Sequence, residues 1–340
     1  MKNTITIMLF MLLYMNTSAQ YYLKKDYIEL QKQDETLYGI TFKNLKIVPL
    51  FAGASFVAAN NDVGKFRTLK EVLEAGQVEI KETGAVQQNQ SGGIPNRQLN
   101  QSDMNAGNSG DVNHLMIRNL TQDTVFIMAG ELVQGGKQDR VVGENFLLPP
   151  GKDFVPLPVF CVEHGRWTYN NSDKSGFKKY NSFTANSVRS KAVQSKDQSQ
   201  VWSQVSEITT ANKSSTSTGT FNAIFENEAF SKEYDEYKEY FLAELGKING
   251  CIGFAGISGG RVVGCDIFAT EDLFRQQSVS LLSAYITEAI TENKAPSLSD
   301  REIQDYLLSF LTESVRQDQD INEKGRAFEN AGKKLHIATF

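Results

Sequence analysis

The sequence predicts an α+β protein with an antiparallel, β-rich core, either a sandwich or an open barrel, and with several helices mainly from the C-terminal half. Two observations support this fold class. Residues 114–162 contain short runs of β-branched and aromatic residues separated by turn signals, which is typical of antiparallel strands. After residue 200 the apolar residues recur at helical spacing instead.

Residues 1–19 have the pattern of a signal peptide. Lys2 precedes an apolar run that is about half of the ~20 residues a membrane-spanning helix needs, and Thr17 and Ala19 suit a cleavage site. We therefore expect a periplasmic or secreted protein with no membrane attachment after cleavage; a short N-terminal anchor is the alternative. Loss of Lys2 takes the formal net charge from −5 to −6, which excludes the basic footprint of a nucleic-acid-binding protein.

The next elements surround a polar tract. A strand is expected at residues 45–51, and a short helix follows, with a capping box formed by Thr68 and Glu71. Residues 84–111 carry too few large apolar side chains to offset the entropy of ordering them, so we interpret them as a flexible insertion within a domain. Further strands are expected at residues 78–80, 115–118, 125–129, 146–148 and 154–162.

The second half predicts helices around one hairpin. Residues 168–196 are polar and turn-rich, whereas residues 232–245 predict a helix. The other expected elements are a hairpin at 252–268 turning at Gly259 and Gly260, a helix from Thr270, a helix capped by Ser299 and Glu302, and a strand at 335–340. We assign residues 20–292 to one α+β domain and residues 293–340 to a helix-and-strand extension packed on it.

Three cysteines, Cys161, Cys251 and Cys265, are too few and odd in number to form a disulfide framework. Cys251 and Cys265 flank the predicted hairpin. In the register that opposes Cys265 to Phe254, the two thiols face opposite sides of the sheet, because side chains alternate along a strand. We expect all three thiols to be free.

Most of the polar chemistry lies between Gly130 and Trp167, and its first part is a glycine turn. Gly135 and Gly136 allow the backbone to turn its amides outward, and Lys137 and Arg140 add positive charge beside them. This combination suits a phosphate, although it is neither a Walker loop nor a dinucleotide fingerprint. The alternative is a hairpin turn with a solvated charged strand.

The second part is the strand end at residues 161–167. Cys161 and Glu163 share one face of the strand, close to Arg166. A buried structural cysteine and a structural ion pair are the alternative interpretation. His164 has the wrong parity to serve Cys161 as a base. The three histidines have no metal-ligand spacing, so we predict no metal site.

Two carboxylates in this region suggest a further alternative. Glu131 and Glu163 are the candidate acid/base pair of a hydrolase, provided that they converge on one pocket.

The combined motifs resemble those of the ARPP-1 family, named for its association with ADP-ribosylglycohydrolase and rhodanese-phosphatase proteins. The resemblance is carried by GELVQGGKQDR, by LPPG and by CVEHGRW, with Asp139 in place of the family's usual Asn. TLKEVLEAGQVEIKETG, QVW and GFAGISGGRVVGCDIF extend it to roughly residues 40–292. The resemblance implies a role near NAD-derived or ADP-ribosyl metabolism and no established reaction.

We therefore expect a domain that binds a phosphorylated or nucleotide-like small molecule, with an acid/base hydrolase or a structural module with a buried polar network as alternatives. Cationic side chains would bind anionic groups, and Trp167 would stack on a base or sugar. Neither a cofactor nor a protein partner is identified by the sequence. The predicted ligand-binding residues are Gln134, Lys137, Gln138, Arg140, Cys161, Arg166 and Trp167, and the predicted catalytic pair is Glu131 and Glu163.

Overall fold

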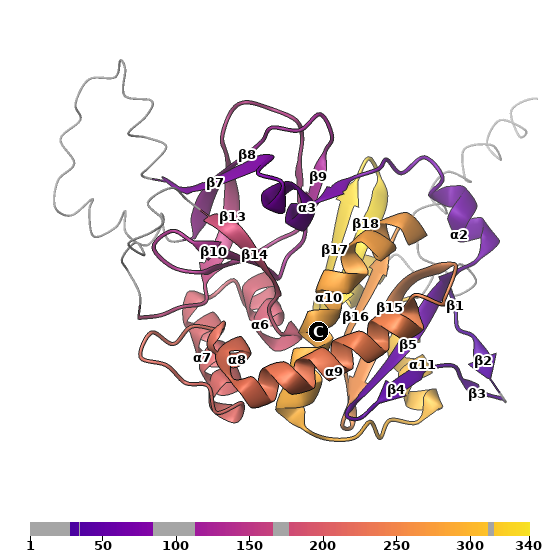
Figure 1. The fold of residues 1–340 in the computed structure, drawn as a ribbon. Coiled ribbons are helices and arrows are strands. Elements are labelled where there is room, and N and C mark those ends of the chain that lie inside the picture. The colour runs from indigo at the N-terminus through magenta and orange to yellow at the C-terminus, as the bar shows by residue number, and fades with distance from the viewer. Residues whose placement is uncertain (1–27, 34, 84–112, 166–176, 312–315) are drawn as a thin grey trace, which may run out of the picture.

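The computed structural model describes residues 28–33, 35–83, 113–165, 177–311 and 316–340 (Figure 1). Within these ranges the α+β prediction is confirmed: antiparallel strands form a large sheet and a barrel, and most helices follow residue 185. The predicted signal peptide, the polar insertion at 84–111, and Arg166 and Trp167 lie outside the described residues. None of the described helices is long and apolar enough to span a bilayer.

A seven-stranded antiparallel sheet forms the centre of the described chain. The hairpin of β15 and β16 lies in its middle and turns at Gly259 and Gly260, as predicted. Cys265 faces Ala255 and not Phe254, a one-residue difference from the expected register. The strand order is β1 (Ile28–Glu29), β5 (Leu45–Ala52), β15 (Cys251–Ser258), β16 (Arg261–Phe268), β18 (Lys333–Thr339) and β17 (Gly325–Asn330), with β4 (Ile40–Phe42) also paired to β5.

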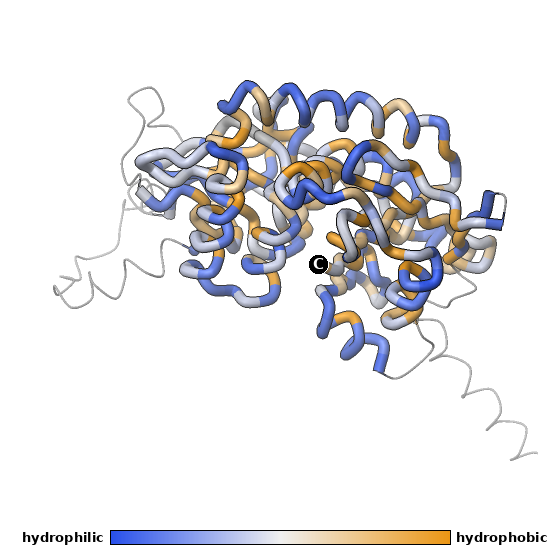
Figure 2. The backbone as a smooth tube through the Cα atoms, turned by 90° about the horizontal axis from the view of Figure 1, so that it is seen from below, coloured by the Kyte–Doolittle hydropathy of each residue, from blue (hydrophilic) through white to orange (hydrophobic). Residues whose placement is uncertain are grey.

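Helices cover both faces of this sheet (Figure 1). One face packs against α9 (Glu228–Leu245) and α10 (Glu271–Glu292). The other packs against α2 (Ala54–Ala59), α11 (Asp300–Leu308) and α12 (Gln317–Lys324). The predicted caps of two of these helices are confirmed, because Thr270 accepts the Leu273 amide and Ser299 and Glu302 form a capping box. Figure 2 shows the hydrophobic segments gathered between these layers.

A closed six-stranded barrel lies beside the sheet (Figure 1). Its closing strand, β14 (Phe177–Phe183), pairs with both β10 and β7. The interpretation of residues 168–196 as polar and turn-rich did not predict this strand. The barrel is closed, whereas the sequence predicted a sandwich or an open barrel. The barrel order is β10 (Glu131–Gly135), β11 (Arg140–Val142), β13 (Val155–Cys161), β8 (His114–Asn119), β7 (Val78–Glu82) and β14.

Smaller elements join the barrel to the sheet. The predicted capping box of Thr68 and Glu71 starts α3 (Leu69–Glu74), which lies against β14. One hydrophobic core runs from the outer barrel wall, with Leu132 and Phe160, to α10, so the two β units are packed as one body. The remaining elements are β2 (Lys32–Gln33), β3 (Thr36–Leu37), β6 (Arg67–Thr68), β9 (Val125–Ile127), β12 (Phe146–Leu148), α6 (Asn186–Ser190), the π-helix η1 (Lys191–Ser195), α7 (Gln198–Ala211) and α8 (Ala223–Glu226).

Candidate functional site

The predicted glycine turn forms, but the protein's own carboxylates occupy it. Gly135 and Gly136 have positive φ angles of 135° and 54°, which glycine adopts readily. The amide of Gly135 donates to Asp139 at 3.4 Å, and the amide of Lys137 donates to Glu82 at 2.8 Å. Gln134 is half-buried and also reaches Asp139, at 3.5 Å. These contacts leave the turn amides directed at carboxylates of the same chain.

The other predicted binding residues that the structure describes form a buried network at the end of the barrel. Arg140 and Cys161 are fully buried, and Gln138 is 2% exposed. The Gln138 side-chain amide donates to the Glu163 carbonyl at 2.6 Å, and Arg140 donates to Gln138 Oε1 at 3.3 Å. A second arm of Arg140 lies 3.7 Å from the carboxylate of Glu82. The network thus ties the β10–β11 hairpin to the end of β13.

Cys161 is unsuited to nucleophilic chemistry at neutral pH. Burial raises the pKa of its thiol to about 11; nearby Arg140 opposes this shift, and Glu82 and Glu163 add to it. The thiol is therefore protonated, and the thiolate is the reactive form. His164 is exposed and packs on Trp202 instead.

The two candidate catalytic carboxylates belong to different networks. Glu131 is fully buried, and its Oε2 accepts the Met128 amide at 2.7 Å. Glu163 is 5% exposed, and its Oε2 accepts the Asp139 amide at 3.4 Å. Neither residue is among those that line the pocket between α6–η1 and the β17–β18 hairpin.

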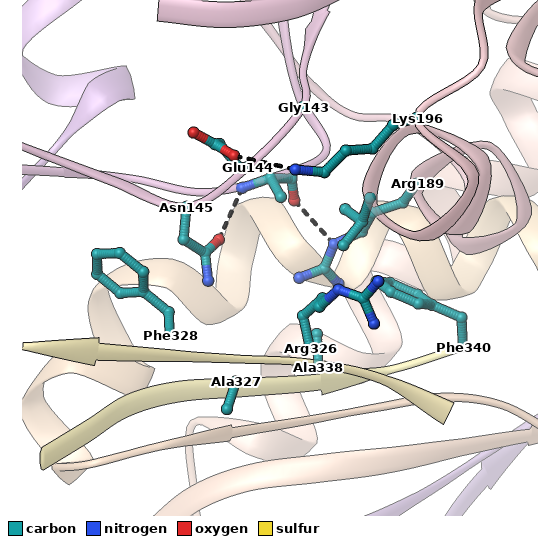
Figure 3. A pocket seen from close by; sticks show the side chains of 12 residues that line it. Gly143, Glu144, Asn145, Arg189, Lys196, Arg326, Ala327, Phe328, Ala338 and Phe340 are labelled. Carbon is teal, nitrogen blue, oxygen red and sulfur yellow. Dashed lines mark hydrogen bonds and ion pairs between the residues drawn. The ribbon is translucent and has the colours of Figure 1, made fainter. Parts of the chain in front are cut away.

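An open pocket lies beside this motif region, where the barrel meets the sheet (Figure 3). Its volume is about 290 Å³. Three segments form its walls: residues 143–145 after β11, the α6–η1 helix, and the β17–β18 hairpin. The side chains that give it chemical character are Glu144, Arg189, Lys196, Arg326, Phe328 and Phe340.

The helical wall owes its shape to a change of helix type. The chain passes from α6 into the π-helix η1, a form frequent at functional sites, and ends at Lys196 in the left-handed conformation with φ 50°. Arg189, Val193 and Lys196 all line the pocket from this segment. The wider turn therefore presents three side chains of one short helix to the same cavity.

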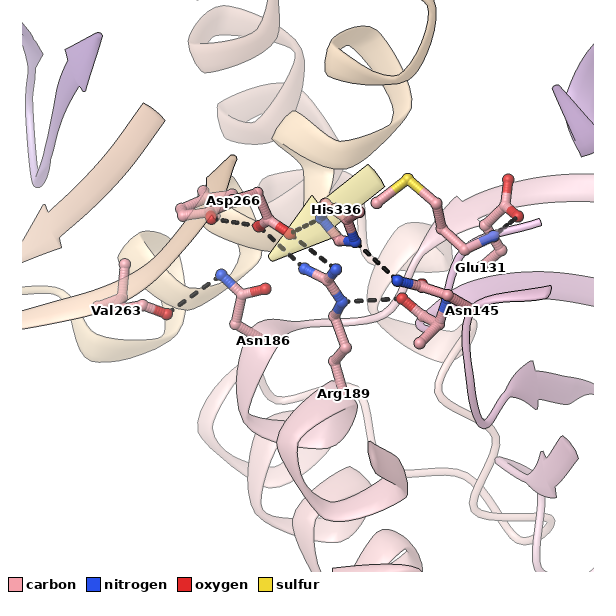
Figure 4. A network of polar contacts seen from close by, with 10 residues as sticks. Glu131, Asn145, Asn186, Arg189, Val263, Asp266 and His336 are labelled. Atoms are coloured by element: carbon pink, nitrogen blue, oxygen red, sulfur yellow. Dashed lines mark hydrogen bonds and ion pairs between the residues drawn. The ribbon is translucent and has the colours of Figure 1, made fainter. Parts of the chain in front are cut away.

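Arg189, which lines the pocket, belongs to a buried ionic network (Figure 4). Arg189 binds both carboxylate oxygens of Asp266, at 2.8 and 3.0 Å. His336 Nε2 lies 2.8 Å from Asp266, and its Nδ1 lies 2.8 Å from the side-chain amide of Asn145. The Tyr285 hydroxyl donates to the same carboxylate. Strand β16, the last strand and the pocket loop are thus joined through one carboxylate.

Electrostatics in this network favour an ionised Asp266 and a neutral His336. Burial by itself would raise the pKa of Asp266, but the charge of Arg189 and the contact with His336 outweigh it, and the pKa is lowered. Burial also lowers the pKa of His336, against the attraction of Asp266. Neutral His336 then donates from Nε2 to Asp266 and accepts the Asn145 amide at Nδ1.

Positive charge in the pocket exceeds what neighbouring carboxylates neutralise. Asp266 pairs with Arg189, and Glu144 lies 3.5 Å from Lys196. Arg326 donates to the carbonyls of Asn322 and Gly325, and the described residues give it no carboxylate partner. Arg189 and Arg326 point toward the cavity from opposite walls (Figure 3). With two phenylalanine rings beside these cations, the pocket suits an anionic ligand.

Sequence reasoning missed the residues of this pocket. Asp266 left a signal, because it is a charged residue within the apolar strand GCDIF. No sequence signal indicated Arg189, because its helix lies in the segment interpreted as polar and turn-rich. Groups of three or more metal-ligating side chains are absent from the described part of the chain.

The family model described as ARG and Rhodanese-Phosphatase-superfamily-associated Protein domain, ARPP-1, matches residues 35–337. The match extends past residue 292 and includes β17 and most of β18. No curated protein and no solved structure matches the chain.

Proposed function

The chain belongs to the ARPP-1 family, and we propose that it binds a phosphorylated or nucleotide-like small molecule in the pocket between α6–η1 and the β17–β18 hairpin. The observation that carries this proposal is the excess of cationic side chains there. Lys196 and Arg326 line the cavity from different elements, and Arg189, held by Asp266, lines it beside them. Arginine and lysine side chains commonly bind phosphate groups in proteins.

Two further observations support the class of ligand. Phe328 and Phe340 offer apolar surface beside the cations, which suits a molecule with a ring as well as a phosphate. The family is named for an association with ADP-ribosylglycohydrolase and rhodanese-phosphatase proteins. The volume of about 290 Å³ lies at the lower end of the ~300–1,000 Å³ of ligand sites, so a sugar phosphate fits better than a whole dinucleotide.

The hydrolase alternative has less support. Acid/base hydrolysis needs two carboxylates facing one substrate. Glu131 and Glu163 instead accept backbone amides in separate networks. The motif residues Gln138 and Arg140 form a buried network that holds the β10–β11 hairpin to the end of β13.

A thermal-shift titration with ribose 5-phosphate, ADP-ribose and NAD tests the proposal. Ligand at about 100 times its Kd stabilises a protein by ~2.7 kcal/mol, which raises the Tm by several degrees. We expect such a rise for at least one of the three, and its loss in the double variant Lys196→Gln/Arg326→Gln. Both side chains are at least partly exposed, so the variant is expected to fold.

The matched control is Arg301→Gln, because the Arg301 side chain is 90% exposed on α11 and lies outside the pocket. It should keep the full ligand-induced rise in Tm. Absence of a shift with all three compounds, or an equal shift in the double variant and the parent protein, would overturn the proposal.

A further inference from the structure

A second groove lies on the outer side of α7, away from the cationic pocket. It has a volume of about 450 Å³. Helix α7 forms one wall, the loop at residues 215–219 forms the other, and His164 lies at the edge. The opposite face of α7, with Val201 and Val205, is buried in the core, so the groove side is the solvent side of an amphipathic helix.

The helical wall is a line of hydroxyl groups around one indole ring. Ser199, Ser203 and Ser206 recur at helical spacing, i, i+4 and i+7, and Trp202 lies among them. All three serine side chains are exposed, and their hydroxyls make no hydrogen bond within the described residues. Each therefore has a donor and two acceptor positions open to a ligand.

The opposite wall is preformed. Gly165 donates its amide to the Thr218 carbonyl at 2.7 Å, and Glu163 and Thr220 form a β-bridge. A Cβ atom at Gly165 would lie 2.9 Å from the backbone of Ser217 and Thr218, so glycine allows this close approach. These contacts hold the backbone of the loop in place beside Gly165.

Two properties of the groove define its ligand. Among the described residues that line it there is no Asp, Glu, Lys or Arg, in contrast to the cationic pocket. Trp202 is half-buried, and a T-shaped contact with His164, with ring centroids 4.4 Å apart, fixes its orientation. A fixed aromatic surface bordered by hydroxyls matches a molecule with an apolar C–H face and a polar rim.

We propose that this groove binds an uncharged, polyhydroxylated ligand, namely a neutral saccharide. The indole ring of Trp202 stacks on the C–H face of a sugar ring. The serine and threonine hydroxyls of both walls form hydrogen bonds with the hydroxyl groups of the sugar. The site is independent of the phosphate pocket, because the two share no lining residue.

Tryptophan fluorescence tests the proposal. The chain has two tryptophans, Trp167 and Trp202, so the variant Trp167→Phe leaves Trp202 as the only indole reporter. We expect a saturable fluorescence change on titration with at least one of glucose, galactose, N-acetylglucosamine and maltose, up to about 10 mM. In the Trp167→Phe background, the further substitution Ser203→Arg places a large side chain on the groove wall and should weaken binding at least tenfold. Position 203 is exposed and arginine is a good helix former, so the helix is expected to remain intact.

The matched control adds Ser55→Ala, which removes an exposed hydroxyl on α2 outside the groove and should leave binding unchanged. A lack of saturable change with all four sugars would overturn the proposal. So would equal affinity in the Ser203→Arg variant. The variant Lys196→Gln/Arg326→Gln, which alters the phosphate pocket, should retain saccharide binding. The two proposals can therefore fail independently of each other.

Discussion

Arg189 is the residue on which the junction of barrel and sheet depends most directly. Its guanidinium holds both oxygens of Asp266 and also donates to the Ala129 carbonyl at 2.8 Å. The side chain lies against the rings of Phe183 and Phe340. Because both members of the ion pair are fully buried, neither can replace its partner with water.

Replacing Arg189 by Met should therefore destabilise the fold by ~3–5 kcal/mol, the usual result of leaving one buried charge unpaired. Urea unfolding followed by circular dichroism measures this. Arg275→Met is the control, since Arg275 forms a surface ion pair with Glu271 that is worth ~0–1 kcal/mol. Equal losses in both variants would contradict the role assigned to Arg189.

The identity of this residue could not be predicted from sequence. The helix that carries it has five residues before η1 begins, and its apolar residues are too few to show a helical period. Short helices depend on tertiary packing and not on local propensity. By contrast, the Thr68, Thr270 and Ser299 caps were predictable, because a cap is formed within three residues of sequence.

At the scale of elements, strand β15 and helix α10 approach each other closely at Gly256. A Cβ atom at Gly256 would lie 2.3 Å from the Tyr285 ring, which also donates to Asp266. The glycine in β15 therefore permits the helix to approach the sheet closely enough to complete the ionic network.

Gly256→Ala should separate these two elements and destabilise the protein by ~1–3 kcal/mol, the usual cost of overpacking. Gly151→Ala is the matched control, because a Cβ atom there meets nothing within 4 Å. Thermal unfolding of the two variants against the parent protein gives the comparison, and a Gly256→Ala protein as stable as the control would disprove the contact.

Sequence patterns predicted elements with long apolar runs better than the closure of the barrel. The hairpin at 252–268 and the strands at 146–148 and 154–162 show clear alternation or apolar runs, and all are present. Strand β14, with sequence FKKYNSF, does not, because only its two ends are phenylalanine. Its place is determined by pairing with β10 and β7, which are distant in sequence.

For the whole molecule, the buried network predicts how stability depends on pH. The folded pKa values of His336 and Asp266 are both lowered from their ordinary values, so folding disfavours the protonated forms. The contribution of these two groups to the free energy of unfolding is complete above their ordinary pKa values, about 6.5 for His and 3.9 for Asp. It is lost as the pH falls through their pKa values in the folded protein. The free energy of unfolding should thus decline below about pH 6.5, first through His336.

Urea unfolding at about pH 7.5, 6.5 and 5.5 checks this expectation. His336→Gln should be less stable than the parent at the highest pH, because a buried ring stacked on Phe268 is lost, yet show a flatter dependence on pH. If the free energy of unfolding of His336→Gln fell with pH as steeply as that of the parent protein, the acid sensitivity would come from other groups.

In the candidate site, too, the features formed by neighbouring residues could be predicted from the sequence, and those formed by distant segments could not. The glycine turn and the strand end at 161–163 were predictable as a polar cluster, and they are one, with Arg140 at its centre. The open pocket combines residues 143–145, 189–196 and 326–340, which only the three-dimensional fold brings together. A motif therefore located the region but not the cavity beside it.

The three cysteines belong to the packed interior of the fold. All are free and buried, and burial raises the pKa of each thiol, to about 11 for Cys161 and Cys251 and well above its ordinary value for Cys265. Cys251 and Cys265 contribute to the two hydrophobic cores on opposite faces of the sheet. The fold thus has no covalent cross-link to gain from an oxidant or lose to glutathione. The three thiols therefore contribute to the stability of the fold by packing in its interior and not by cross-linking the chain.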